Sequence, residues 1–183
     1  MSASAGESRP LPNSYWVIPG RFAAGEYPGA KDPDEAAARL RALLSAGVDH
    51  FIDLTEPGEG LAPYAEMAAV EAARLGTHVV HERHPIVDVS VPASPREMSG
   101  ILDAIETALH GGETVYLHCW GGVGRTATAV GCWLVRRGRT GDEALAQVAE
   151  WWRGVEKAHR RPHSPETRQQ RAYVRGWAEP RAR

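Results

Sequence analysis

The fold is decided by a stretch in which a strand, a glycine-rich turn and a helix follow one another. Residues 114–138 read TVYLHCWGGVGRTATAVGCWLVRRG. The first five, Thr114 to His118, are short, apolar and partly β-branched, as in a buried strand. The segment from Arg125 to Arg137 is largely apolar and stops at Gly138, as in a helix that a glycine terminates. A strand that leads directly into a helix is the unit from which parallel sheets are built.

The segments on either side continue this alternation. Helices are predicted for Ala- and Leu-rich runs that begin at an N-cap residue or end at a glycine. Strands are predicted for the short apolar runs between them. The predicted helices are 32–47, 61–75, 94–110, 140–155 and 164–177, and the further strands are 48–54 and 77–83. We therefore expect a single α/β domain with a central, largely parallel sheet, helices on both faces and a site beyond the carboxyl ends of the strands.

Length and composition fit one folded domain. The chain has 183 residues, 43% of them hydrophobic, which is enough for a sizeable core. We predict that the domain covers residues 13–178, that residues 1–12, rich in Ser, Gly and Pro, form a disordered lead-in, and that 179–183 form a tail. The lead-in lacks the basic and apolar regions of a signal peptide.

Charge and cysteine content narrow the function classes. With 21 Lys and Arg against 23 Asp and Glu, the net charge of −2 gives no general attraction to nucleic acid or to an anionic membrane. No apolar run approaches the roughly 20 residues of a membrane-spanning helix. The two cysteines, Cys119 and Cys132, do not form the framework of a secreted disulfide-rich domain. We expect a cytoplasmic protein.

The turn after the strand 114–118 carries the most specific signal. Cys119 and Arg125 are separated by five residues, three of them glycine. Glycines let the backbone turn its N–H groups inward, and the helix that begins at Arg125 adds the positive end of its dipole. Such a turn would cradle an oxyanion and stabilise Cys119 as a nucleophilic thiolate. Arg125 could then bind two phosphate oxygens at once.

The sequence HCWGGVGRT of this turn resembles the HC-x5-R-[ST] phosphate loop of the cysteine-based protein tyrosine and dual-specificity phosphatases. The resemblance implies a dual-specificity-phosphatase-like fold in which Cys119 attacks phosphorus and Arg125 binds the phosphoryl group. It also implies that Thr126 donates a hydrogen bond to the sulfur and that His118 orients the loop. The phosphate-binding backbone would be that of Trp120, Gly121, Gly122, Val123 and Gly124.

The same resemblance calls for an acid that protonates the leaving group, on a loop before the cysteine. Asp88 lies 31 residues before Cys119, in a loop with apolar flanks that would favour the protonated carboxyl on closure. Asp53 and Glu56, at the end of the strand 48–54, are alternative acids. Further along the chain, Gln169 lies in a segment similar to one with which some relatives position the water for phosphocysteine hydrolysis.

Two other features of the sequence suggest different chemistry. His78, His81 and His84 are spaced three apart, which suggests a metal site, but residues three apart on a strand point to opposite faces, and a phosphatase of this type needs no metal or other cofactor. Cys132 could form a disulfide with Cys119 under oxidation, although a small buried helix residue is the simpler explanation.

The substrate follows from the loop composition and the resemblance together. Positions 120–124 contain no Lys, Arg or His, whereas relatives that act on inositol phosphates tend to have basic residues there. A phosphorylated protein is therefore the expected partner, with phosphotyrosine as main substrate and phosphoserine or phosphothreonine as further ones. RNA 5'-triphosphatase activity is an alternative, for which the basic patch is His159, Arg160, Arg161 and His163. A catalytically silent phosphotyrosine-binding or phosphate-binding module is another. The oligomeric state stays open.

Overall fold

The computed structural model describes residues 8–180, in which five strands form one sheet. The strands are β1 (Ser14–Ile18), β2 (Phe22–Gly25), β3 (His50–Asp53), β4 (Val80–Arg83) and β5 (Val115–His118), in the order β1-β2-β5-β3-β4. The pairings β2–β5, β5–β3 and β3–β4 are parallel, and only the β1–β2 hairpin is antiparallel. The predicted largely parallel sheet is thus confirmed.

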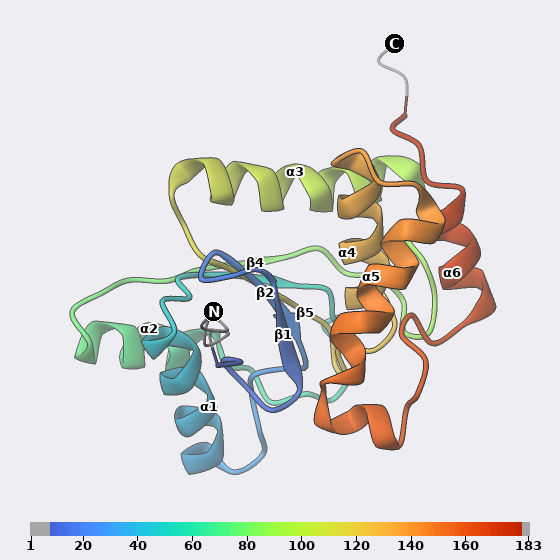
Figure 1. Ribbon diagram of the computed structural model, residues 1–183. Helices are drawn as coiled ribbons and strands as arrows, with labels where there is room; N and C mark the ends of the chain where they lie inside the picture. The colour runs from blue at the N-terminus through green and yellow to red at the C-terminus, as the bar shows by residue number, and fades with distance from the viewer. Residues whose placement is uncertain (1–7, 181–183) are drawn as a thin grey trace, which may run out of the picture.

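Helices cover both faces of this sheet (Figure 1). Helices α1 (Pro33–Ser45) and α2 (Ala65–Arg74) pack on one face, where Leu40, Leu43 and Ala68 meet Phe51 and Tyr116 of the strands. The other face carries α3 (Pro95–Gly111), α4 (Arg125–Arg136), α5 (Gly141–Arg153) and α6 (Arg168–Arg175), with the short 3-10 helix η1 (Glu156–His159) between the last two. Helix α4 is buried along almost its whole length, so it is the central helix of this second layer.

Local sequence signals explain where the helices begin. The Asp32 carboxylate accepts hydrogen bonds from the backbone N–H groups of Asp34 and Glu35 at the start of α1, and Ser94 caps α3 in the same way. The last helix begins at Arg168 rather than at the predicted residue 164, because Thr167 forms a capping box with Gln170 there. This shift of the helix start matters for the site described below.

The two ends of the domain extend further than the sequence suggested. Leu11 is buried, and its N–H donates to the Ser14 hydroxyl at 2.9 Å, so the chain packs against the domain two residues before the predicted start at residue 13. Residues 1–7 of the predicted lead-in and 181–183 of the predicted tail lie outside the described residues. Glu179 is held to the domain by Arg136, to which it is bonded at 2.5 and 3.0 Å.

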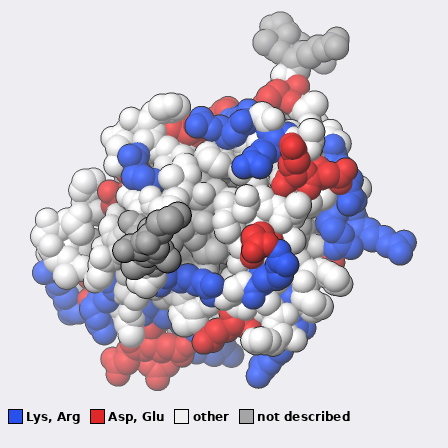
Figure 2. Space-filling model, in the orientation of Figure 1, with Lys and Arg blue, Asp and Glu red and all other residues white. Residues whose placement is uncertain are grey.

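The face of the molecule in Figure 2 carries no broad area of a single charge sign, because basic and acidic side chains are interspersed on it. Among residues 8–180, none of the helices is of a length and apolarity that would let it cross a bilayer.

Candidate active site

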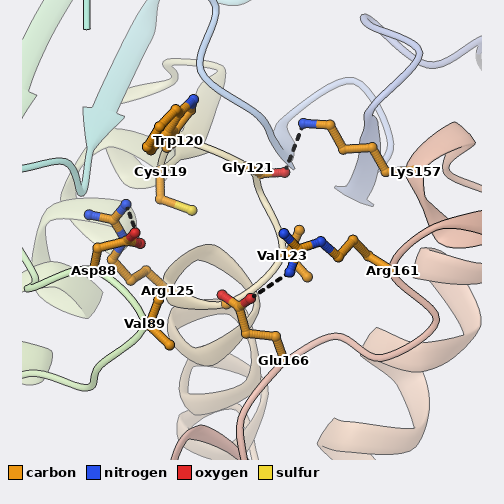
Figure 3. Close-up of a pocket in the computed structure, with 11 residues that line it drawn as sticks. Asp88, Val89, Cys119, Trp120, Gly121, Val123, Arg125, Lys157, Arg161 and Glu166 are labelled. Atoms are coloured by element: carbon orange, nitrogen blue, oxygen red, sulfur yellow. Dashed lines mark hydrogen bonds and ion pairs between the residues drawn. The ribbon is translucent and has the colours of Figure 1, made fainter. Parts of the chain in front are cut away.

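The glycine-rich turn lies at the carboxyl edge of the central strand. Strand β5 is flanked by β2 and β3, and the turn leads from its last residue, His118, into α4. Cys119 is almost fully buried at the base of a pocket of about 340 Å³. Figure 3 shows its sulfur directed into this pocket, with Asp88 on one side and the loop backbone on the other. The predicted nucleophile and the predicted acid are therefore brought together.

Glycine is required at the centre of the loop. Gly122 has a φ of 73°, and a Cβ atom there would lie 2.5 Å from the carbonyl carbon of Gly25. Three hydrogen bonds from outside hold the loop carbonyls. The Tyr27 N–H donates to the Trp120 oxygen at 2.9 Å, the Ser164 hydroxyl to the Val123 oxygen at 2.7 Å, and the Lys157 ammonium to the Gly121 oxygen at 3.4 Å.

The loop's N–H groups are left for another ligand. Among the described residues, no acceptor is bonded to the backbone N–H groups of residues 120–124. Two polar atoms beside them, the Arg125 Nε and the Thr126 Oγ1, are also buried without a partner in the described structure. Buried polar groups are normally paired. Together with the helix N-terminus at Arg125, this set of donors suits a tetrahedral oxyanion.

Arg125 is held in place by an acidic residue that the sequence did not indicate. Glu59 binds its guanidinium through both oxygens, at 2.5 and 2.9 Å, and the Ile86 carbonyl accepts a further bond at 3.0 Å. Burial alone would raise the pKa of Glu59, but the hydrogen bonds from Arg125 outweigh it and lower that pKa. Glu59 therefore remains a carboxylate that aligns the guanidinium plane.

The His118 ring contacts the loop backbone on one side and Tyr64 on the other. Its Nδ1 lies 3.2 Å from the Cys119 carbonyl oxygen, and its Nε2 lies 2.6 Å from the Tyr64 hydroxyl. Burial lowers the pKa of His118 to about 4, so the ring is neutral near pH 7. The Nδ1–H then donates to the carbonyl, and Nε2 accepts from Tyr64. His118 thus ties the cysteine's backbone to α2.

Asp53, an alternative acid in the sequence, is absent from the lining of the pocket. It is fully buried and accepts bonds from the Thr55 backbone N–H at 2.8 Å and from Arg83 at 2.8 and 3.1 Å. Burial would raise its pKa, but the hydrogen bonds from His81 and Thr55 hold that pKa well below its usual range. It is a permanent carboxylate that organises the end of β3. Glu56 is absent from the lining of the pocket described above.

Asp88 lines the pocket from the loop after β4. Its carboxylate lies 2.9 Å from the Arg125 Nη2, and its side chain is about half exposed, at 48%. The next residue, Val89, has a positive φ of 59° and an exposed side chain. For a β-branched residue this backbone conformation is strained.

The predicted glutamine is displaced by one residue. Gln169 is exposed, whereas Gln170 is fully buried and its Nε2 donates to the Ser90 carbonyl at 3.1 Å, in the Asp88 loop. A Cβ atom at Gly124 would approach the Gln170 amide and the Glu166 carboxylate within 3.0 Å, which places both beside the phosphate loop. Gln170 links α6, the phosphate loop and the Asp88 loop.

Cys132 and the histidines spaced three apart lie outside the pocket. Cys132 is a free, fully buried thiol on α4, and burial raises its pKa far above the usual value. His81 and His84 face the carboxylates of Asp53 and Glu82. Within residues 8–180, no cluster of His, Cys, Asp or Glu has the arrangement of a metal site.

The comparisons with known proteins agree with this geometry. The family model described as "Swiss Army Knife protein, DSP-PTPase phosphatase domain" matches residues 11–174. The chain belongs to this family of phosphatases. It is similar to the crystal structure of Tk-PTP in its active form, with 30% sequence identity, a TM-score of 0.59 and coverage of 90% of this chain and 94% of that one.

Two further relatives match this chain at lower sequence identity or over a shorter stretch. P. aeruginosa TpbA, solved in complex with pTyr, has the same fold at 18% identity and a TM-score of 0.64, covering 96% of this chain and 92% of that one. "Putative tyrosine phosphatase 067L" of Invertebrate iridescent virus 3 is 31% identical over 99 residues, which are 52% of this chain. The match spans only 38% of that viral protein.

Proposed function

We propose that the protein hydrolyses phosphotyrosine in proteins, with Cys119 as nucleophile and a phosphocysteine intermediate. The observation that carries the proposal is the convergence on one pocket of the Cys119 sulfur, the unbonded loop N–H groups and the Arg125 guanidinium. An anion with several oxygens is the ligand that such donors fit.

In the first step the Cys119 thiolate attacks phosphorus, and the bond from phosphorus to the tyrosine oxygen breaks. Asp88 gives its proton to the leaving phenolate. In the second step water attacks the phosphocysteine, the S–P bond breaks and the proton of the water returns to Asp88. Arg125 and the loop N–H groups stabilise the charge on the phosphoryl oxygens in both transition states. The Thr126 hydroxyl, which has no partner within the described structure, is the proposed donor to the departing sulfur.

The pairing of Asp88 with Arg125 is compatible with the acid role. In the free protein the Asp88 carboxylate lies 2.9 Å from the Arg125 Nη2. A bound phosphoryl dianion would take over the guanidinium and leave Asp88 beside a negative charge. Asp88 is then released from Arg125 and free to donate its proton to the leaving oxygen.

The second step needs a residue that positions the attacking water. We assign the water-positioning role to Gln170, in place of Gln169, because its amide lies against Gly124 and the Asp88 loop.

The reaction proceeds without a metal, since Arg125 and the loop N–H groups supply the positive charge. A thiolate nucleophile works in a reducing compartment, so we propose a cytoplasmic location.

The test is hydrolysis of para-nitrophenyl phosphate across pH, with a chelator present, by the native protein, Cys119→Ser and Asp88→Asn. Activity of the native protein should survive chelation and vanish in Cys119→Ser. In Asp88→Asn the fall in rate at high pH should disappear, because no acid remains to be deprotonated. A native protein that binds phosphotyrosine without turning it over would replace this proposal with the binding-module alternative.

A further inference from the structure

Exposed apolar side chains gather at the mouth of the catalytic pocket. Within residues 8–180, five large apolar side chains are exposed, and three of them belong to the two loops that frame this pocket. These are Val87 and Val89 in the Asp88 loop and Trp120 in the phosphate loop, with exposed fractions of 53% to 61%. Figure 3 shows Val89 and Trp120 on different sides of Cys119. Exposed apolar groups that gather beside a site indicate a binding surface.

Trp120 separates the catalytic pocket from a second groove. It lines both, and the second groove has a volume of about 390 Å³. Other apolar residues of this groove come from the connection between β2 and α1, with Tyr27 and Ala30, and from the loop between β3 and α2, with Leu61 and Ala62. Because one side chain forms a wall of both cavities, a substrate that fills the catalytic pocket extends next to the groove.

The walls of the groove are held in place by Tyr27. Its N–H donates to the Trp120 carbonyl at 2.9 Å, and its hydroxyl donates to the Ala62 carbonyl at 2.9 Å. Its buried ring packs edge-on against Tyr64 and His118. One residue therefore fastens the phosphate loop to the loop between β3 and α2, and such a preformed groove lowers the entropic cost of binding a ligand.

The carboxylates of the groove are already neutralised by cations of the protein. Glu59 is bound through both oxygens by Arg125. Glu26 lies 2.5 Å from the Lys157 ammonium and 3.7 Å from Arg39. The apolar surface, in contrast, has only water to contact, so it gains most from a ligand that covers it. An apolar occupant is therefore favoured over a charged one.

We propose that the groove binds a large apolar side chain that flanks the phosphotyrosine of the substrate, and that Trp120 selects it. The inference rests on the proposed function and narrows its substrate class to phosphotyrosine next to a residue such as Phe or Leu. That side chain packs against the indole of Trp120 and against Leu61, and water leaves all three surfaces. Tryptophan is among the residue types that most often carry the binding energy of protein interfaces.

The experiment compares three phosphotyrosine peptides of equal length in which both neighbours of the phosphotyrosine are Ala, Phe or Glu. We expect the native protein to favour the Phe peptide over the Ala peptide by about tenfold in kcat/KM, as partial burial of one large apolar side chain provides. Leu61→Ala should lose most of this preference. Leu109→Ala is the matched control, because Leu109 is also a half-buried leucine but is absent from the linings of both cavities.

Two variants of Trp120 test its part in the selection. Trp120→Ala should lose the preference for the Phe peptide, and Trp120→Phe should keep part of it, because a smaller aromatic ring still covers the ligand. The readout is the ratio of kcat/KM between the peptides. The Trp120 backbone belongs to the phosphate loop, and a general change in rate cancels in this ratio.

Equal kcat/KM values for the Phe and Ala peptides in the native protein would overturn the proposal. So would an equal loss of preference in Leu61→Ala and Leu109→Ala. A preference for the Glu peptide would assign the groove to acidic residues through Lys31, an exposed cation of its lining, and would exclude the apolar occupant. If the protein hydrolyses a phosphorylated lipid in phosphatidylcholine vesicles and does not discriminate among the peptides, the apolar mouth serves a lipid surface and the peptide assignment is wrong.

Affinities of the same peptides for Cys119→Ser separate this proposal from the proposed function. If the native protein hydrolyses none of the peptides, the proposed function fails. Tighter binding of the Phe peptide that depends on Leu61 would then still support the groove assignment, whereas equal affinities for the Phe and Ala peptides would overturn it.

Discussion

Glu59 binds both terminal nitrogens of Arg125, at 2.5 and 2.9 Å, although the two residues are 66 positions apart in the chain. The pair spans the edge of the sheet, because Glu59 lies in the loop between β3 and α2 and Arg125 opens α4. The carboxylate fixes the plane of the guanidinium, and with it the directions in which Arg125 can donate to a phosphoryl group.

Replacing Glu59 by Gln should therefore lower kcat/KM for para-nitrophenyl phosphate by about 10- to 100-fold, because a misplaced guanidinium loses contacts to the transition state. Inhibition by inorganic phosphate should weaken in parallel, while the rate of Cys119 alkylation stays within about twofold. Glu56→Gln is the control, since Glu56 reaches Glu59 only through its backbone N–H, which the substitution keeps. A Glu59→Gln protein with native kinetics would contradict the positioning role.

A methyl group at Gly122 should destabilise the protein and impair the loop. The positive φ of 73° and the 2.5 Å approach to Gly25 together predict a loss of about 2 kcal/mol or more in the free energy of unfolding. Gly121→Ala is the matched control, because a Cβ there would meet only the Val123 side chain, at 3.4 Å. Urea unfolding of both variants measures the difference. Equal stability of the two would show that the loop relaxes freely.

Neutral His118 should make the fold sensitive to moderate acid. Burial lowers the pKa of His118 from 6.5 to about 4, so the unfolded chain binds a proton more readily than the folded one between these values. The stabilisation is complete above about pH 6.5 and is lost as the pH falls toward 4. Between pH 7 and 4.5 the loss should be about 2 to 3 kcal/mol.

The measurement is the free energy of unfolding in urea at several pH values. The lowered pKa values of Asp53 and Glu59 act mainly below this range, so His118→Gln should have a flatter profile than the native protein. Parallel profiles would mean that the folded and unfolded states protonate His118 equally, contrary to the lowered pKa inferred above.

The parts of the site that depend on chain neighbours could be predicted from the sequence. The strand, the glycine turn and α4 are contiguous, so the relation of Cys119 to Arg125 follows from local rules of turn and helix formation. The order in which the five strands lie across the sheet did not follow from those rules.

Contacts between distant segments could not be predicted in this way. Nothing in the spacing relates Glu59 to Arg125 or Tyr64 to His118, because both pairs depend on the course of the loop between β3 and α2. The displacement from Gln169 to Gln170 has a local cause. The helix starts after Thr167, and that start sets which face of α6 is turned toward the phosphate loop.

The most direct test of the central claim is to trap the intermediate on Cys119. The native protein, reacting with para-nitrophenyl phosphate, is quenched in acid, digested and examined by mass spectrometry. We predict one phosphoryl group on the peptide that contains Cys119, and none on the corresponding peptide of Cys119→Ser, which should also be inactive. Continued hydrolysis with no phosphoryl group on Cys119, or full activity in Cys119→Ser, would contradict the account.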